Sequence, residues 1–378
     1  MSDEAAHKAG GGLCPKKCHV NVRFDTRRRQ LVADNVTTQA DHMMEGPSAT
    51  HRRELWDKPR SRCDGSGGYV RIFQDEFNEG TLDNATWGAW EEGRGGGDAG
   101  GSMTQSAVGH ASNVLVENGN LVLVTRRATA QERHSLGAEY LTGAVTTRLR
   151  RHFEPGRLCV SAKLPGSARG KPGSNQGLWP AHWLMPIHAN DFDQTKGCWP
   201  DLGEIDIMEQ VNGEPSWFGT YHWNGKYTPA SESSSHKPAS AHAGVAAQAK
   251  EAAGRCSVVH DEGGHGEVQR CVPLTRWDER FHEFAVEWDG ASFLSFFINA
   301  VHISTVNAGV TPPTRTPEGL QEGSPAPTPS FYDDPMFLML QTAVGGPWPG
   351  EPTGATALPV HHVIDYVRYE SRPRAENR

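Results

Sequence analysis

The residues best suited to chemistry are three carboxylates within the segment Gly203–Glu209. In a helix, Asp206 and Glu209 would lie about 200° and about 140° around the axis from Glu204, which scatters the three acids. In a strand, Glu204 and Asp206 share one face, but Glu209 is out of phase. A β-bulge at Ile207–Met208 would turn Glu209 to that same face and send an apolar residue into the core. The segment therefore predicts a bulged strand with three carboxylates on one face.

Three carboxylates on one face of a sheet repel one another, and this raises the pKa of at least one of them. A general acid that works near neutral pH needs a raised pKa, whereas a nucleophilic carboxylate must stay ionised. Retaining glycosidases divide these roles between two carboxyl groups about 5 Å apart, a gap that inward-leaning Glu204 and Glu209 side chains can reach, with Asp206 between them. A solvated acidic strand and a calcium site are the alternatives. The pattern favours glycoside hydrolysis.

Tryptophans are concentrated around these acids. Five of the eleven lie close to them in sequence: Trp179, Trp183, Trp199, Trp217 and Trp223. Exposed indole faces are suitable platforms for sugar rings, because they offer a flat apolar surface with one polar edge. Core packing is the alternative for each one, but five tryptophans in one core would be crowded. We therefore expect some of them to line a groove, and Trp179 and Trp183 share strand parity.

The elements that must position these residues are short strands. The chain has 378 residues, with 42 glycines and 25 prolines, a composition that favours many strands and turns over a helical bundle. From Tyr69 onwards, ten short β-branched or aromatic segments are bounded by Gly, Pro or Asn. Alternating runs flank Asn118-Gly119, which is a strong hairpin signal. The expected fold class is all-β, a sandwich of two sheets.

Composition also divides the chain and excludes some functions. Residues 1–65 are expected to form a poorly ordered basic extension, residues 66–372 the β-sandwich domain with a loop insert at 226–275, and residues 373–378 a tail.

The net charge of -8 gives no electrostatic footprint for binding nucleic acid. No apolar run reaches the ~20 residues of a membrane span. The start lacks a secretory signal, so the chain is expected to be cytoplasmic, exported by another route or given with an incomplete start.

Several segments taken together resemble the signature blocks of glycoside hydrolase family 16, in its laminarinase (endo-β-1,3-glucanase) branch. The resemblance covers roughly residues 69–370. Its acids have the bulged spacing of laminarinases, agarases and carrageenases, not the shorter spacing of lichenases and xyloglucan transferases. The matching segments are Gly177–Pro186, Trp199–Glu209, Thr220–Trp223, Gln74–Asn78, Phe281–Trp288, Gln341–Gly350 and Ile364–Arg368.

The resemblance implies a concanavalin-like β-jelly-roll in which a curved sheet forms an open substrate cleft. It implies endo-acting hydrolysis of β-1,3-glucan with retention, with Glu204 as nucleophile, Glu209 as general acid/base and Asp206 as their hydrogen-bonding partner. A polysaccharide substrate, no cofactor for catalysis, a monomer and an extracellular location are expected. The residues that match cleft positions of the family are Asn113, Arg157, Trp179, Trp183, His222, Gln341 and Trp348.

Some positions depart from the family pattern. Cys159 and Ser161 replace a Glu and an Arg, and Gln341 replaces an Asn, so the preference of the sugar subsites is open. A galactan hydrolase acting on agarose or carrageenan is one alternative, although a sulfated galactan favours a basic cleft that this acidic chain does not indicate. Transglycosylation is another. A non-catalytic β-glucan recognition protein is the third, but such relatives typically lack the catalytic acids.

Two further sites are expected. By resemblance, Glu76, Asp365 and the carbonyl of Gly119 match the ligands of a structural calcium ion, which prefers oxygen ligands. In the insert, Cys256 and Cys271 flank a Gly-rich loop that contains His260 and His265. A disulfide and a Cys2His2 zinc site compete there. We favour the disulfide because the family is mostly secreted and because the spacing lacks the close cysteine pair of most zinc modules.

Overall fold

The computed structural model describes residues 22–25, 30–33, 60–90, 107–187, 203–224, 265–274, 276–307, 334–346 and 348–373. They belong to two compact units. One unit contains the antiparallel hairpin of β1 (Val22–Asp25) and β2 (Gln30–Ala33). Most of residues 1–65 and 226–275, and all but the first residue of the tail, lie outside the described residues, so the domain limits remain a prediction.

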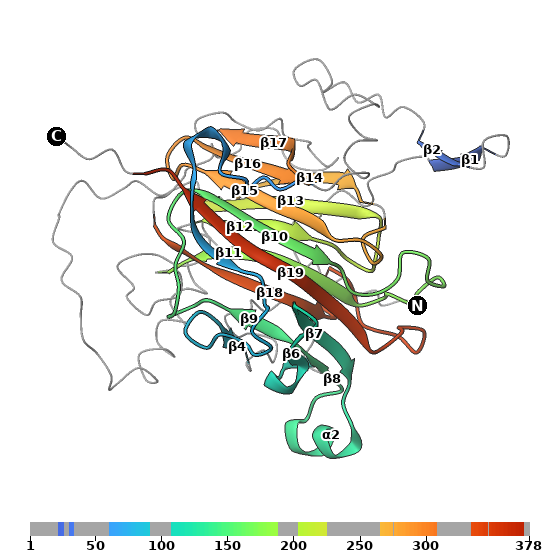
Figure 1. Ribbon diagram of the computed structural model, residues 1–378. Helices are drawn as coiled ribbons and strands as arrows, with labels where there is room; N and C mark the ends of the chain where they lie inside the picture. Colours follow the sequence, from blue (N-terminus) through green and yellow to red (C-terminus); the bar gives the residue numbers. More distant parts are fainter. Residues whose placement is uncertain are drawn as a thin grey trace, which may run out of the picture. The chain divides into compact units, whose positions relative to one another are not determined.

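The second unit is a sandwich of two largely antiparallel sheets (Figure 1), as the sequence predicts. The ten-stranded sheet contains β17 (Val301–Asn307), β16 (Phe293–Ile298), β15 (His282–Trp288), β10 (Arg157–Lys163), β19 (Val360–Ser371), β7 (Asn120–Arg127), β8 (Tyr140–Thr142) and β5 (Ala107–Gly109), with β3 (Val70–Asp75) on β19 and β6 (Val114–Glu117) on β7. The seven-stranded sheet contains, in order, β14 (His265–Pro273), β13 (Ser216–Asn224), β12 (Glu204–Glu209), β11 (Leu178–Pro186), β18 (Met336–Val344), β9 (Ala144–Thr146) and β4 (Gly88–Ala89).

Short segments complete the unit. They are the 3-10 turns η1 (Ser66–Gly68) and η2 (Ala111–Asn113) and the helix α2 (Ala130–Leu136). Thr129 caps α2 through a capping box with Glu132, and Gly137 ends it in the left-handed conformation. The helix is far shorter than a membrane span, and none of the described helices could cross a membrane.

The β6–β7 hairpin shows how local sequence determines the strand pairing. Its turn residues Asn118 and Gly119 both have positive φ angles, 53° and 71°. A two-residue turn of this kind matches the twist of the flanking strands, and Asn-Gly is the pair that tolerates it best. Register then follows from the turn, with Glu117 opposite Asn120. The hairpin predicted from the sequence is therefore confirmed.

The core lies between the two sheets and is built from alternate residues of each strand. On β12, Ile205 belongs to it, while Glu204 and Asp206 point to the opposite, outer face of the seven-stranded sheet. Four tryptophans, Trp87, Trp217, Trp223 and Trp277, are fully buried in this core. For Trp217 and Trp223, core packing is therefore the correct alternative, and Trp199 lies outside the described residues.

A pair of histidines links the two sheets inside the core. His182 of β11 and His362 of β19 are fully buried, their Nε2 atoms are 2.9 Å apart and their rings are stacked. Burial lowers the pKa of His182 well below its usual range and that of His362 to about 3. The pair therefore stays uncharged in the folded protein at neutral pH.

We expect this pair to make the fold acid-sensitive. The pKa of a histidine in the unfolded chain is about 6.5. Below that pH the two histidines are protonated in the unfolded chain but stay neutral in the folded chain. Stability is then lost as pH falls from 6.5 towards 3, by about 3 kcal/mol at pH 4 for His362 alone. Urea denaturation at pH 7 and pH 4 measures this loss, and the double variant His182→Leu/His362→Leu should show a smaller loss than the parent. Equal losses would contradict the assignment.

Candidate active site

A β-bulge positions the three acids, as the sequence predicts. Between Asp206 and Glu209, two residues of β12, Ile207 and Met208, lie opposite the single residue Gly219 of β13. The pairing of β12 with β11 shifts at the same place. Ile207 and Met208 are both buried in the core. The bulge restores the phase of the strand, so that Glu209 joins the other two acids on the outer face.

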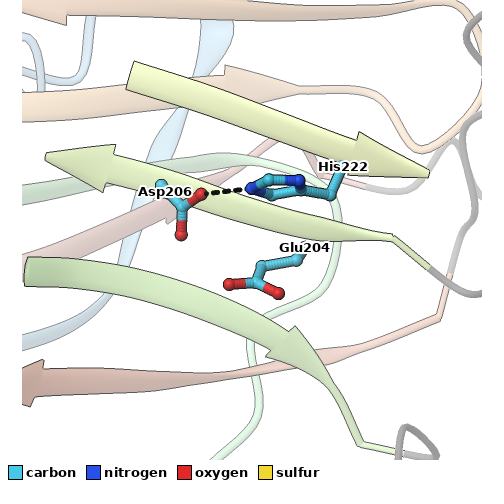
Figure 2. Close-up of side chains that lie close together, drawn as sticks. All are labelled: Glu204, Asp206 and His222. Atoms are coloured by element: carbon cyan, nitrogen blue, oxygen red, sulfur yellow. Dashed lines mark hydrogen bonds and ion pairs between the residues drawn. The ribbon is translucent and has the colours of Figure 1, made fainter. Parts of the chain in front are cut away.

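Glu204, Asp206 and His222 form a tight group on that face (Figure 2). One ligand-type atom from each lies within 4.8 Å of the others, and Nε2 of His222 is 3.1 Å from Oδ2 of Asp206. The backbone pairs Glu204 with His222 across β12 and β13, which explains their proximity. Donor atoms this close could hold a metal ion, and two of the three groups are carboxylates of the kind that glycoside hydrolysis uses.

Glu209 has the environment of a proton donor. Its side chain is buried, the indole N–H of Trp179 donates to Oε1 at 2.9 Å, and the Thr220 hydroxyl lies 3.5 Å from Oε2. Burial raises the pKa of Glu209 well above its usual range, and the charge of Asp206 raises it further, against an opposing effect of His222. A carboxyl group with such a raised pKa keeps its proton near neutral pH and can act as a general acid.

Aromatic side chains extend the site along the outer face. Trp179 is half-buried and contacts Trp348 edge-on, with ring centroids 5.2 Å apart, and Trp348 makes a similar contact with Phe218. Trp183 lies on the same face but is only 6% exposed. It packs in a small apolar cluster with Ala181, Met185, Phe337 and Met339. The structure therefore favours packing for Trp183, whereas Trp179 contacts Glu209 and Trp348 contacts Trp179.

The two tryptophans should respond differently to truncation. Trp183→Ala removes a buried ring and should lower the free energy of unfolding by about 3–5 kcal/mol. Trp179→Ala should leave the melting temperature closer to that of the parent and raise KM, because it removes a partly exposed ring beside Glu209. Thermal melts and steady-state kinetics on both variants check this, and a larger loss of stability for Trp179→Ala would contradict it.

Other residues expected in the cleft have different positions. Gln341 lies on the same face of β18 as Met339 and opposite Ala181 of β11. It is therefore next to the small apolar cluster that contains Trp183. Asn113 and Arg157 do not join the acids. The Asn113 amide donates to backbone carbonyls of β7 and β8, which anchors the start of β6.

Arg157 belongs to the ten-stranded sheet. It is 1% exposed and pairs with Glu287 and Glu370, two carboxylates of the same sheet. Its neighbour Leu158 faces the core, so alternation turns Arg157 to the far side, beneath Tyr69. A contact of Arg157 with sugar is therefore not supported, because its charge is used to neutralise buried carboxylates.

The expected calcium ligands are already engaged. Arg368 donates to both carboxylate oxygens of Glu76, at 2.7 and 2.9 Å, and the Ser161 hydroxyl donates to Asp365. Calcium takes 6–8 oxygen ligands, so Glu76 would have to leave Arg368. As placed, the side chains of Glu76 and Asp365 are occupied by Arg368 and Ser161, so the calcium site remains a prediction. We expect the melting temperature to stay constant on adding EDTA and then calcium, and a fall followed by recovery would establish the site.

Sequence reasoning missed a disulfide and a contact to the bulge. Cys63 and Cys159 are joined by a disulfide, whereas Cys256 lies outside the described residues and only the backbone of Cys271 is described, on β14. The Cys256–Cys271 link and its zinc alternative with His260 and His265 therefore remain predictions. The missed contact is the hydrogen bond from the Trp217 indole to the backbone carbonyl of Ile207 in the bulge. It depends on the register of β12 and β13, which the sequence alone does not reveal.

The chain is similar in sequence to known enzymes that are named for glucan and galactan substrates. No protein-family model matches the chain. It is 27% identical over 312 residues to a β-glucanase of Rhodothermus marinus, covering 81% of this chain and 87% of that protein. It is 26% identical to a keratan-sulfate endo-1,4-β-galactosidase of Sphingobacterium multivorum, with 82% of this chain aligned to 57% of that relative.

Solved structures show the same fold. The laminarinase catalytic domain of Thermotoga maritima superimposes with a TM-score of 0.57 at 23% identity, covering 81% of this chain and 99% of that domain. This likeness confirms the jelly-roll sandwich expected from the sequence.

Proposed function

We propose that this chain, which belongs to glycoside hydrolase family 16, is an endo-acting enzyme that hydrolyses β-1,3-glucan with retention of configuration. The observation that supports this best is the bulged strand β12, which presents an ionisable pair, Glu204 and Glu209, on one face with Asp206 between them. A soluble polysaccharide such as laminarin would be the substrate, and no cofactor is needed for this chemistry.

The residues divide the reaction into two steps. Glu204 attacks the anomeric carbon while Glu209 donates its proton to the departing glycosidic oxygen, which leaves a covalent glycosyl–enzyme ester. Glu209, now ionised, then takes a proton from water, and the hydroxide attacks the same carbon and releases Glu204. Asp206 contributes its charge, which helps Glu209 to retain the proton before the first step.

A galactan is the second candidate substrate. The support for it is the similarity to a galactosidase that acts on keratan sulfate, together with Gln341 near the acids, which departs from the laminarinase pattern. Next to the acids, the described outer face carries aromatic side chains, and the guanidinium of Arg148 lies over Phe337; the acids themselves favour a neutral glucan over a sulfated galactan. The presence of all three acids argues against a non-catalytic recognition protein.

A product profile on a panel of polysaccharides tests the proposal. Laminarin, lichenan, agarose, carrageenan and keratan sulfate would each be incubated with the enzyme, and reducing ends and oligosaccharide sizes measured. We expect laminarin to be cleaved fastest, into a mixture of short oligosaccharides. Proton NMR of the first products should show the β-anomer, and acceptor sugars should reveal any transfer. Faster cleavage of a galactan would replace the glucan proposal, and no cleavage of any polymer would favour recognition.

A further inference from the structure

Trp217 makes an unusual contact with the bulge that carries Glu209. It lies on β13, is fully buried in the core, and donates its indole N–H to the backbone carbonyl of Ile207 at 3.0 Å. The partner is one of the two residues of β12 that lie opposite the single residue Gly219. A side chain from the neighbouring strand therefore contacts the backbone at the point where β12 leaves its regular register.

The position of Ile207 explains why this contact matters. In the pairing of β12 with β11, Met208 lies opposite His182 and Asp206 opposite Trp183, so Ile207 is passed over. The pairing with β13 passes over it as well. A bulge residue loses its place in the ladder, and a buried carbonyl without a donor is unfavourable. The indole N–H of Trp217 supplies a donor at this place.

The strand opposite the bulge is shaped to hold the indole. A Cβ atom on Gly219 would lie 2.3 Å from the six-membered ring of Trp217, so the ring occupies the space above that glycine. From the other sheet, Phe296 contacts the ring edge-on, with centroids 5.7 Å apart. The indole is thus held between the two sheets, with its N–H directed at Ile207.

We propose that Trp217 is a positioning residue for Glu209, because its hydrogen bond to Ile207 fixes the bulge that brings this carboxyl group onto the face of Glu204. The inference rests on the proposed hydrolysis and identifies what aligns its proton donor. A shift of register by one residue turns every side chain to the opposite face of a strand. A loosened bulge would therefore misplace Glu209 while Glu204 and Asp206, which precede it, keep their pairing.

The test removes the hydrogen bond and keeps the ring. Trp217 would be replaced by 3-benzothienylalanine, in which sulfur takes the place of the N–H, and by Phe. Trp277 is the matched control, since it is fully buried in the same core and its Nε1 has no partner among the described residues. The same replacements at Trp277 perturb the core and leave the bulge intact.

Two substrates separate positioning from general loss of structure. Hydrolysis of laminarin needs Glu209 to protonate the leaving group. The dinitrophenyl β-glycoside of laminaribiose has a leaving group that needs no proton, and azide as the acceptor needs no general base. We expect the Trp217 variants to lose about 10–100-fold in kcat on laminarin with KM little changed, and less than about 3-fold on the activated substrate with azide. The Trp277 variants should lose little on either.

Hydrogen exchange gives a readout that does not depend on activity. Amides of residues 205–211 should exchange faster in the Trp217 variants and at the parent rate in the Trp277 variants. Equal losses on both substrates, or unchanged exchange across these residues, would overturn the inference. If the parent enzyme cleaves no glucan while exchange still rises in the Trp217 variants, the proposed substrate fails and the role of Trp217 in holding the bulge stands. Gly219→Ala, which displaces the ring, should reproduce the Trp217 effects.

Discussion

Replacing Glu204 by Gln should lower kcat on laminarin by several orders of magnitude while KM stays close to that of the parent. The amide is a poor nucleophile, so the glycosyl–enzyme ester cannot form, whereas contacts that bind the ground state and the transition state equally remain in place. We expect Trp179 and Trp348, whose rings contact each other edge-on, to supply such contacts. Steady-state kinetics and binding calorimetry with laminarin oligosaccharides measure the two effects separately.

Two companion variants make the assignment specific. Glu209→Gln should retain activity on an activated aryl glycoside and recover further with azide, because azide needs no general base, whereas Glu204→Gln should not recover in this way. Asp206→Asn preserves the shape of the side chain beside His222. It should lower kcat on laminarin less than either glutamate variant does. Retention of more than about a tenth of the parent activity by Glu204→Gln would show that another group is the nucleophile.

The sequence alone predicts the bulge because a regular strand over Glu204–Glu209 cannot place all three acids on one face. Glu204 and Asp206 follow the period of a strand, Glu209 does not, and the apolar residues between them need to reach a core. An insertion of one residue satisfies all of these demands, and the structure has it. Because hydrophobic alternation and turn residues are local signals, the sandwich and the β6–β7 hairpin also followed from the sequence.

Residues whose role depends on distant partners could not be placed in this way. Arg157 and Trp183 are residue types that often line sugar-binding clefts. Their surroundings depend on which sheet each strand joins and on which side chains pack over it, and these are tertiary properties. The His182–His362 pair joins strands 180 residues apart in sequence. Disulfide pairing has the same character, because seven cysteines allow many connectivities and local spacing favoured Cys256 and Cys271 over Cys63 and Cys159.

The disulfide between Cys63 and Cys159 should be one of the largest single contributions to stability. It joins residues 96 apart in sequence, and closing a loop of this size is worth about 4–5 kcal/mol on the loop-entropy estimate. It attaches the segment before β3 to strand β10 of the ten-stranded sheet. Both sulfur atoms are buried with Ala285 and Phe297, so the bridge also anchors a small apolar cluster.

The segment held by this bridge covers buried charges, which adds to the expected effect. Arg62 pairs with Glu287, and its backbone carbonyl accepts from Arg157, which lies beneath it between Glu287 and Glu370. If the segment detached, water would reach an ion-pair network that is favourable only while all of its partners are in place.

The double variant Cys63→Ala/Cys159→Ala should therefore lower the urea midpoint by about 2 M, given a slope of about 2 kcal/mol per M. Reduction of the parent protein should lower the midpoint by at least as much, and the midpoint of the double variant should change less on reduction than that of the parent. The kcat on laminarin at low temperature should stay within about 2-fold of the parent, because the bridge lies on the ten-stranded sheet and the acids on the other. Free thiols at both cysteines in the untreated protein, or an unchanged midpoint on reduction, would show that this bridge does not stabilise the fold.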